Sequence, residues 1–262
     1  MSNNFFDVNG RCVTNLTKHK VYQKSRNYFQ LDKKRVLSYT NNKIFNNLKN
    51  YLCKNIDFNE TEFENKIINI KNQIKKDNTI SNILNGYSIP FIIPKLENED
   101  IGTNIEEVFI PALQLSFKNE FEEFELINHI KTSLKNQLDS WTDSKYEKIT
   151  EKLKNQNITG LLFPSLNEFS FPAAIETVSK LPENIMLAGG YEIMSALIGS
   201  PSILRRDDGY PPLLWFSSLK NANDKNIGYH IEPYGYNLTI NRRAHIDSAA
   251  EYWWHSVVII ED

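Results

Sequence analysis

In the second part of the chain, short apolar runs of strand length alternate with stretches of helical spacing, and this alternation constrains the fold most. The runs TGLLFPS at 159–165 and NIMLAGG at 184–190 are typical of buried strands. Between them, Pro172 suits the first turn of a helix, and 191–199 follows as a short apolar helix. Strand–helix–strand–helix order predicts a partly parallel sheet that is covered by helices.

Further strands follow towards the C-terminus. They are PPLLWFSSL at 211–219, YHIE at 229–232, YNLTI at 236–240 and SVVII at 256–260. Because Pro233-Tyr234-Gly235 joins the middle two, we expect a hairpin that adds antiparallel strands. The expected class is therefore α/β or α+β, with an N-terminal helical part packed on a C-terminal mixed sheet with covering helices.

The first part of the chain is predicted to be mainly helical. Thr61 and Glu64 have the S/T-x-x-E arrangement of a capping box. The helix that they begin presents one apolar face, made of Phe63, Ile67, Ile70 and Ile74. Another helix is expected to begin near Ser144 and Glu147. YSIPFIIPK at 87–95 is apolar and is interrupted by two prolines, which indicates an extended or edge segment.

A longer apolar stripe predicts one long helix over 113–141. Its members alternate spacings of three and four residues, which is the pattern of one helix face. They are Leu113, Phe117, Phe121, Phe124, Ile127, Ile130, Leu134, Leu138 and Trp141. The other faces of this stretch are rich in Glu, Lys and Asn, as expected for the solvated side of a helix.

Composition changes near residue 158. Most of the lysines precede it, whereas most of the glycines and the arginine pairs follow it. We therefore divide the chain into a helical Lys/Asn-rich part, 1–157, and an α/β part, 158–262, which carries the candidate site. We expect the two parts to fold as one cooperative unit, because 262 residues also suit a single large domain.

Charge and composition narrow the function classes. The net charge is −2, so nothing in the composition attracts nucleic acid or an anionic membrane. Apolar residues make up 40% of the chain and charged residues 24%, as in a globular protein that is soluble. Cys12 and Cys53 cannot form a disulfide framework, which indicates a reducing compartment. With no signal peptide pattern at the N-terminus, the expected location is cytoplasmic.

Histidines and acids are concentrated near the C-terminus, in GYHIEPYGYNLTINRRAHIDSAAEYWWH. His230 and Glu232 lie two residues apart on a predicted strand, so both side chains point to one face. His245 and Asp247 repeat this spacing, and His255 adds a third imidazole. Two histidines and a carboxylate around an open position suit Fe²⁺ or Zn²⁺. The predicted ligands of such a divalent metal are His230, Glu232, His245 and His255.

The neighbouring residues complete this hypothetical active site. Asp247 and Glu251 are the predicted catalytic carboxylates. Arg242 and Arg243 suit a phosphate or carboxylate group, and together with Tyr234 they are the predicted binding residues for a small anionic substrate. A bound metal would polarise a substrate oxygen or lower the pKa of water to about 7. Both a hydrolytic and an oxygen-dependent reaction stay open.

The same residue types also have an ordinary structural interpretation. Ser248 and Glu251 match a capping box, and Glu251 precedes His255 by four residues, a routine pair on a helix face. Arg205-Arg206-Asp207-Asp208 is favoured as a self-paired charged turn. Leu187-Ala188-Gly189-Gly190 is favoured as a tight turn over an anion site.

Two function classes therefore remain. The first is a soluble enzyme that uses the C-terminal His/carboxylate site. The second is a non-enzymatic subunit or adaptor, because aromatic residues gather in FSFP, GYPPLLWF, PYGY and EYWW and such residues anchor protein interfaces. Its partner would be a second copy of the chain or another protein of an assembly. Sequence motifs of P-loop NTPases, zincins and serine hydrolases are absent.

Overall fold

The computed structural model describes residues 4–24, 28–54 and 56–261. Its α-helices are α1 (Lys33–Ser38), α2 (Asn41–Tyr51), α3 (Glu60–Lys76), α4 (Ile101–Asn104), α5 (Ile110–Glu120), α6 (Glu147–Leu153), α7 (Phe171–Ser179) and α8 (Gly190–Gly199). The shorter turns are η1 (Thr14–Leu16), η2 (Ser81–Asn85), the π-helical η3 (Ile105–Phe109) and η4 (Thr142–Ser144). None of the described helices is long and apolar enough to cross a membrane.

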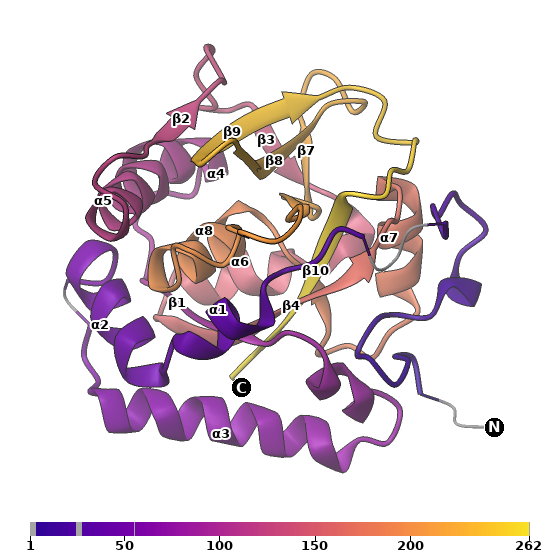
Figure 1. The fold of residues 1–262 in the computed structure, drawn as a ribbon, viewed down its shortest axis with the longest axis horizontal. Helices are drawn as coiled ribbons and strands as arrows, with labels where there is room; N and C mark the ends of the chain where they lie inside the picture. Colours follow the sequence, from indigo (N-terminus) through magenta and orange to yellow (C-terminus); the bar gives the residue numbers. More distant parts are fainter. Residues whose placement is uncertain (1–3, 25–27, 55, 262) are drawn as a thin grey trace.

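Most of the strands belong to one mixed sheet. The strands are β1 (Ile89–Ile93), β2 (Leu126–Asn128), β3 (Leu138–Ser140), β4 (Ile158–Asn167), β5 (Met186–Leu187), β6 (Leu213–Trp215), β7 (Leu219–Asn221), β8 (Gly228–Tyr234), β9 (Asn237–Arg243) and β10 (Trp253–Ile260). The large sheet has the order β1-β4-β10-β6-β8-β9-β2, with β5 paired to β10, and β3 pairs with β7 in a small second sheet. Within the large sheet, β10–β6 and β2–β9 are parallel and the other pairs are antiparallel. Helices pack against the sheet (Figure 1), which confirms the predicted mixed α/β class.

The helix α8 lies at the centre of the molecule. Its sequence, GYEIMSALIG, is apolar on nearly every side, which is the pattern of a helix that is buried all round. All ten of its residues are buried. It contacts β1 on one side and α2 and α5 on the other, so it forms a layer between the sheet and the outer helices (Figure 1).

Strands from both sides of residue 158 share the large sheet. β1 lies at its edge and pairs with β4 from Ile89↔Leu162 to Ile93↔Ile158, which confirms the extended edge segment predicted for 87–95. β2 pairs with β9 at the opposite edge. One hydrophobic cluster includes buried side chains from both parts of the chain. The sheet and the core therefore continue across the compositional boundary.

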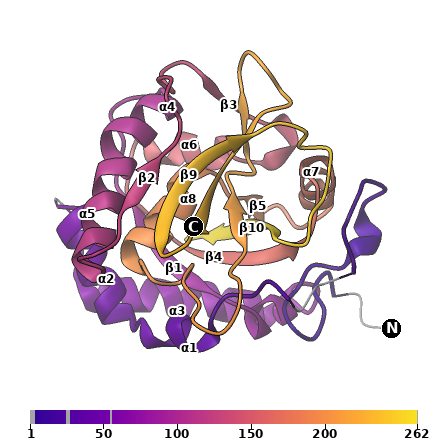
Figure 2. The same ribbon diagram turned by 45° about the horizontal axis from the view of Figure 1, so that its top comes forward.

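The helix α3 covers the outside of β4 and α2 (Figure 2). Its predicted apolar face is confirmed, because Phe63, Ile67, Ile70 and Ile74 are all buried. The predicted capping box is wrong by two residues. The box consists of Asn59 and Glu62: the Asn59 side chain accepts the Glu62 N–H at 3.1 Å, and the Glu62 carboxylate accepts the Asn59 N–H at 2.7 Å. Asn is as good an N-cap as Thr, so both frames fit the sequence rule.

We expect Asn59→Ala to lower the free energy of unfolding by about 1 kcal/mol, because the Glu62 N–H in the first turn of α3 loses its side-chain acceptor. Urea denaturation of the variant and the wild type measures this loss. Thr61→Ala is the matched control, since Thr61 is exposed on the same helix and Ala favours helix there. An equal loss in both variants would contradict the observed frame of the cap.

The predicted helix over 113–141 is wrong beyond Glu120. The helix α5 ends there, and its last hydrogen bond runs from the Phe121 N–H to the Phe117 carbonyl oxygen at 2.9 Å. Phe121 itself has an extended backbone, with φ −137° and ψ 91°. The chain continues through β2 and β3 before the next helix begins at Glu147.

Tertiary contacts explain why the helical spacing did not give a helix. The rings of Phe121, Phe124 and Tyr236 surround the guanidinium group of Arg205, which lies 4.8, 5.0 and 5.1 Å from their centres. Beyond these rings, β2 obtains its backbone hydrogen bonds from β9. Beyond α5, the apolar residues of the stripe are therefore buried or half-buried from two short strands and the loops around them. This packing outweighs local helix propensity.

Candidate functional site

The two buried histidines of the C-terminal group belong to one row of side chains across the sheet. Trp215 on β6 is paired with His230 on β8, and His230 with Asn241 on β9. The parallel register of β10 and β6 brings His255 next to Trp215. The Trp215 ring centre lies 6.3 Å from that of His255 and 4.6 Å from that of His230. The indole therefore lies between the two imidazoles.

This row keeps the imidazoles too far apart to share a metal ion. Their strands are two positions apart in the sheet, which corresponds to roughly 9–10 Å. Two imidazole nitrogens on one Zn²⁺ ion must lie within about 4 Å of each other, because each Zn–N bond is about 2 Å long. His230 and His255 therefore do not form the predicted pair of ligands.

The two nitrogens of His255 are already used within the fold. Nε2 donates to the carbonyl oxygen of Phe169 at 2.8 Å, and Nδ1 accepts from the Ser217 hydroxyl at 2.7 Å. A carbonyl oxygen can only accept, so this bond fixes the tautomer of the ring. Burial lowers the pKa of His255 to about 3, so the ring is neutral at physiological pH. These contacts make His255 a structural residue.

His230 and Glu232 confirm the predicted same-face arrangement. Their side chains meet, with Nε2 of His230 3.2 Å from Oε1 of Glu232. The same carboxylate accepts from the Asn241 amide at 3.0 Å. Burial lowers the pKa of His230 although the carboxylate favours its charged form. Burial would raise the pKa of Glu232, but His230, Arg243 and Asn241 together lower it. The pair is a neutral imidazole beside an ionised carboxylate.

The other predicted site residues lie on the surface, away from this row. His245 and Asp247 are exposed in the loop before β10, where His245 has a left-handed backbone with φ 63°. Arg242 is exposed on β9 and Tyr234 at the hairpin. Across residues 4–24, 28–54 and 56–261, no three His, Cys, Asp or Glu side chains are placed to hold a metal ion. The Fe or Zn centre thus stays a prediction that these positions do not favour.

The remaining patterns of this region have structural roles. Arg243 donates to the Tyr252 hydroxyl and packs over its ring. Residues 244–252 form turns, so the Ser248–Glu251 pattern caps no helix there and Glu251 is half-buried outside a helix. The Arg205–Asp208 turn is self-paired as predicted, with Arg206 to Asp208 at 3.1 Å and Arg205 to Asp207 at 3.8 Å.

The tight turn predicted for 187–190 is not observed, because the Ala188 N–H bonds to the Ser256 carbonyl oxygen at 2.9 Å and Gly189 has an extended backbone, with φ −107° and ψ −162°. These residues lead from β5 into α8, and the Gly189 N–H donates to the Glu192 carboxylate at 2.7 Å. The aromatic residues, which the sequence suggested as interface anchors, divide between core and surface. Trp215, Trp253 and Trp254 are buried, whereas several tyrosines are exposed, namely Tyr28, Tyr210, Tyr234 and Tyr236.

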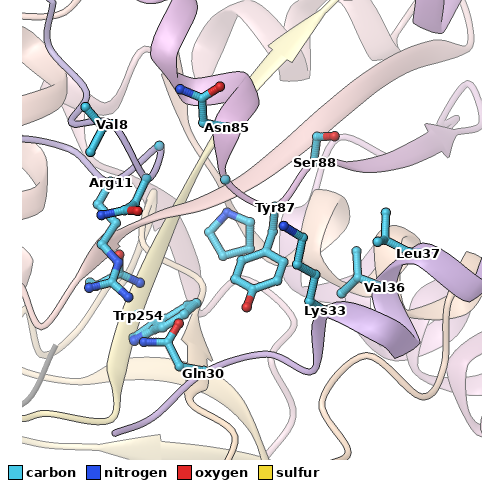
Figure 3. Close-up of a pocket in the computed structure, with 15 residues that line it drawn as sticks. Val8, Arg11, Gln30, Lys33, Val36, Leu37, Asn85, Tyr87, Ser88 and Trp254 are labelled. Atoms are coloured by element: carbon cyan, nitrogen blue, oxygen red, sulfur yellow. The ribbon is translucent and has the colours of Figure 1, made fainter. Parts of the chain in front are cut away.

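The structure contains a pocket that the sequence patterns did not indicate. It has a volume of about 310 Å³, at the lower end of the range for small-molecule sites, which is about 300–1,000 Å³. We call it the N-terminal pocket (Figure 3). Its lining residues are Val8, Asn9, Gly10, Arg11, Gln30, Lys33, Val36, Leu37, Asn85, Gly86, Tyr87, Ser88, Pro164, Asn167 and Trp254.

Positive charge predominates in the N-terminal pocket. Arg11 and Lys33 lie on opposite sides of the Tyr87 ring (Figure 3). Among the described residues that line the pocket there is no Asp or Glu. Burial raises the pKa of Tyr87, the positive charges of Arg206 and Arg11 oppose this rise, and the negative charge of Asp32 adds to it. One further cation, Arg206, and one carboxylate, Asp32, therefore act on the same region from outside the pocket.

An aromatic wall faces these cations. The rings of Tyr87 and Trp254 lie side by side, with their centres 6.3 Å apart and their planes tilted by 40°. The Tyr87 hydroxyl donates to the Leu31 carbonyl oxygen at 2.7 Å, which fixes the ring. Flat ligand groups bind to such surfaces through stacking and apolar contact.

A tight loop positions Arg11. The Asp7 carboxylate accepts the N–H groups of Asn9 and Arg11, both at 2.9 Å. Gly10 has φ +76°, and a Cβ atom there would lie 2.3 Å from the backbone nitrogen of Gly86. Only glycine fits this combination of left-handed backbone and close approach. The loop and the 85–88 segment therefore hold each other in place at the edge of the pocket.

Sequence reasoning missed this pocket because its lining comes from five separate segments of the chain. The one local signal is D-x-N-G at 7–10, a turn pattern, and it says nothing of a ligand. The chain matches no protein-family model, no curated protein and no solved structure.

Proposed function

We propose that this protein binds a small anionic organic molecule in the N-terminal pocket. The observation that carries the proposal is the pairing of Arg11 and Lys33 across a pocket to which, among its described lining residues, no carboxylate contributes. Arginine and lysine bind phosphate and carboxylate groups through charge-assisted hydrogen bonds. The aromatic wall of Tyr87 and Trp254 supports a ligand that also has an apolar or flat part.

The composition of the pocket favours binding over chemistry. Its described lining includes neither His nor Cys, in addition to lacking Asp and Glu. General acid–base catalysis most often uses His, and of the less common candidates in this lining the Tyr87 hydroxyl already donates to the Leu31 carbonyl oxygen. The proposal keeps the anionic ligand predicted from the sequence and moves it from Arg242 and Arg243 to a different part of the fold. An enzyme that uses the C-terminal histidines has no comparable support from their positions.

We expect Lys33→Ala to weaken the binding of phenyl phosphate at least tenfold, as measured by isothermal titration calorimetry. The reason is that a hydrogen bond between charged groups contributes about 1.5–3 kcal/mol. Lys34→Ala is the matched control, because Lys34 is the next residue of α1, is exposed and does not line the pocket. Binding should also weaken as salt is raised.

Two outcomes would reject the proposal. One is the absence of binding by phenyl phosphate and by benzoate, a carboxylate of similar shape. The other is equal weakening in the Lys33 and Lys34 variants, since a charge effect that does not depend on position indicates nonspecific attraction to the surface.

A further inference from the structure

The carboxamide of Asn167 is the one feature of the N-terminal pocket that the anion does not explain. Asn167 ends β4 and lines the pocket. Its side chain is only 1% exposed. Neither its amide nitrogen nor its amide oxygen has a hydrogen-bond partner in the described part of the chain. Buried amides are nearly always hydrogen-bonded in folded proteins, so this one indicates a missing partner.

The sheet places this amide beside the aromatic wall. Asn167 and Trp254 are directly paired in the antiparallel register of β4 and β10. Side chains at such positions point to the same face, with Cβ atoms about 5 Å apart. A flat ring that packs on Tyr87, beside the edge of the 2% exposed Trp254, would therefore present one of its own edges to the Asn167 amide.

We infer that the ligand is a nucleoside monophosphate, an inference that rests on the proposed function of the same pocket. Its base packs on Tyr87 beside the edge of Trp254, and its phosphate binds to Lys33. The Asn167 amide offers one donor and one acceptor side by side, which matches the adjacent acceptor and donor on the edge of a nucleobase. Because the amide can rotate, either order of donor and acceptor on the base is accepted.

Isothermal titration calorimetry with three probes tests this inference. The probes are adenosine monophosphate, phenyl phosphate and ribose 5-phosphate; phenyl phosphate has a flat ring without the donor–acceptor edge, and ribose 5-phosphate has no flat ring. We expect adenosine monophosphate to bind at least tenfold more tightly than either of the others. Asn167→Leu, which is similar in size and apolar, should abolish the advantage of adenosine monophosphate over phenyl phosphate.

The outcomes separate this inference from the proposed function. If adenosine monophosphate binds no more tightly than phenyl phosphate, or if Asn167→Leu weakens both alike, the nucleotide inference is wrong. The proposed function still stands in that case, provided that Lys33→Ala weakens both. If none of the probes binds, the nucleotide inference is wrong, and if benzoate does not bind either, the proposed function is wrong as well. Should Asn167→Leu fail to fold, Asn167→Ala makes the same comparison.

Discussion

Glu192→Gln will stabilise the protein relative to the wild type. We expect this stabilisation to increase by roughly 2–3 kcal/mol between pH 5 and pH 8. Glu192 lies in the first turn of α8, is 0% exposed and accepts the Gly189 N–H. Burial raises its pKa to about 7, although the hydrogen bond from the Gly189 N–H acts in the opposite direction.

The sign follows from proton binding in the two states. In the unfolded chain this carboxyl group loses its proton near pH 4.5, whereas in the folded protein it keeps the proton until about pH 7. Between these values the folded state binds more protons, so its stability falls as pH rises. Glutamine keeps an acceptor for the Gly189 N–H and has no charge to bury, so the variant escapes this loss.

The measurement is the difference in the free energy of unfolding between variant and wild type in urea at pH 5, 6, 7 and 8. The difference between variant and wild type is the correct quantity, because two histidines change the stability of both proteins with pH in the opposite direction to Glu192. Burial lowers the pKa values of His230 and His255, so their contribution to stability is present at high pH and is lost as pH falls below the unfolded value of 6.5. The contributions of the two histidines cancel when the variant is compared with the wild type.

Glu64→Gln, an exposed change on α3, is the control. A difference in the free energy of unfolding between Glu192→Gln and the wild type that stays constant with pH would contradict the prediction.

His255→Ala is expected to lower the free energy of unfolding by about 3 kcal/mol. The change leaves a cavity beside Trp215 and Phe171, whose rings contact the imidazole. It also removes one hydrogen bond each from the Ser217 hydroxyl and the Phe169 carbonyl oxygen. Urea denaturation in the presence and in the absence of EDTA measures the loss, and the two values should agree.

His245→Asn is the matched control, because His245 is exposed and Asn tolerates its left-handed backbone. Its stability should stay within about 0.5 kcal/mol of the wild type. A metal centre makes the reverse prediction: His255→Ala would abolish binding of Fe²⁺ or Zn²⁺ and would cost little stability without metal. That result would restore the C-terminal histidines as ligands.

Regular elements could be predicted where the apolar pattern coincides with tertiary burial. The alternation at 159–199 gave the order of β4, α7, β5 and α8, because short apolar runs between turn signals have few alternatives. The period of two placed His230 and Glu232 on one face for the same geometric reason. The stripe at 113–141 failed because its second half is buried by contacts with β9 and Arg205, which local spacing does not encode.

The candidate site could not be predicted from the same patterns. Imidazoles and carboxylates were chosen for their chemistry, but the row across the sheet places Trp215 between two of them. The N-terminal pocket instead combines residues such as Arg11, Lys33, Asn167 and Trp254, which are far apart in the chain. Their meeting depends on the strand order of the sheet, and strand order is not visible in a single sequence.

The place of β10 in the sheet also affects how the chain is made. β10 is the last of the described strands to leave the ribosome, yet it lies between β4 and β6. Until it emerges, β4 and β6 have open backbone edges, which are sites of aberrant pairing with other nascent chains. Closure of the sheet, and with it the arrival of Trp254 at the pocket, therefore follows the synthesis of all the other described strands, and the edges of β4 and β6 stay open until then.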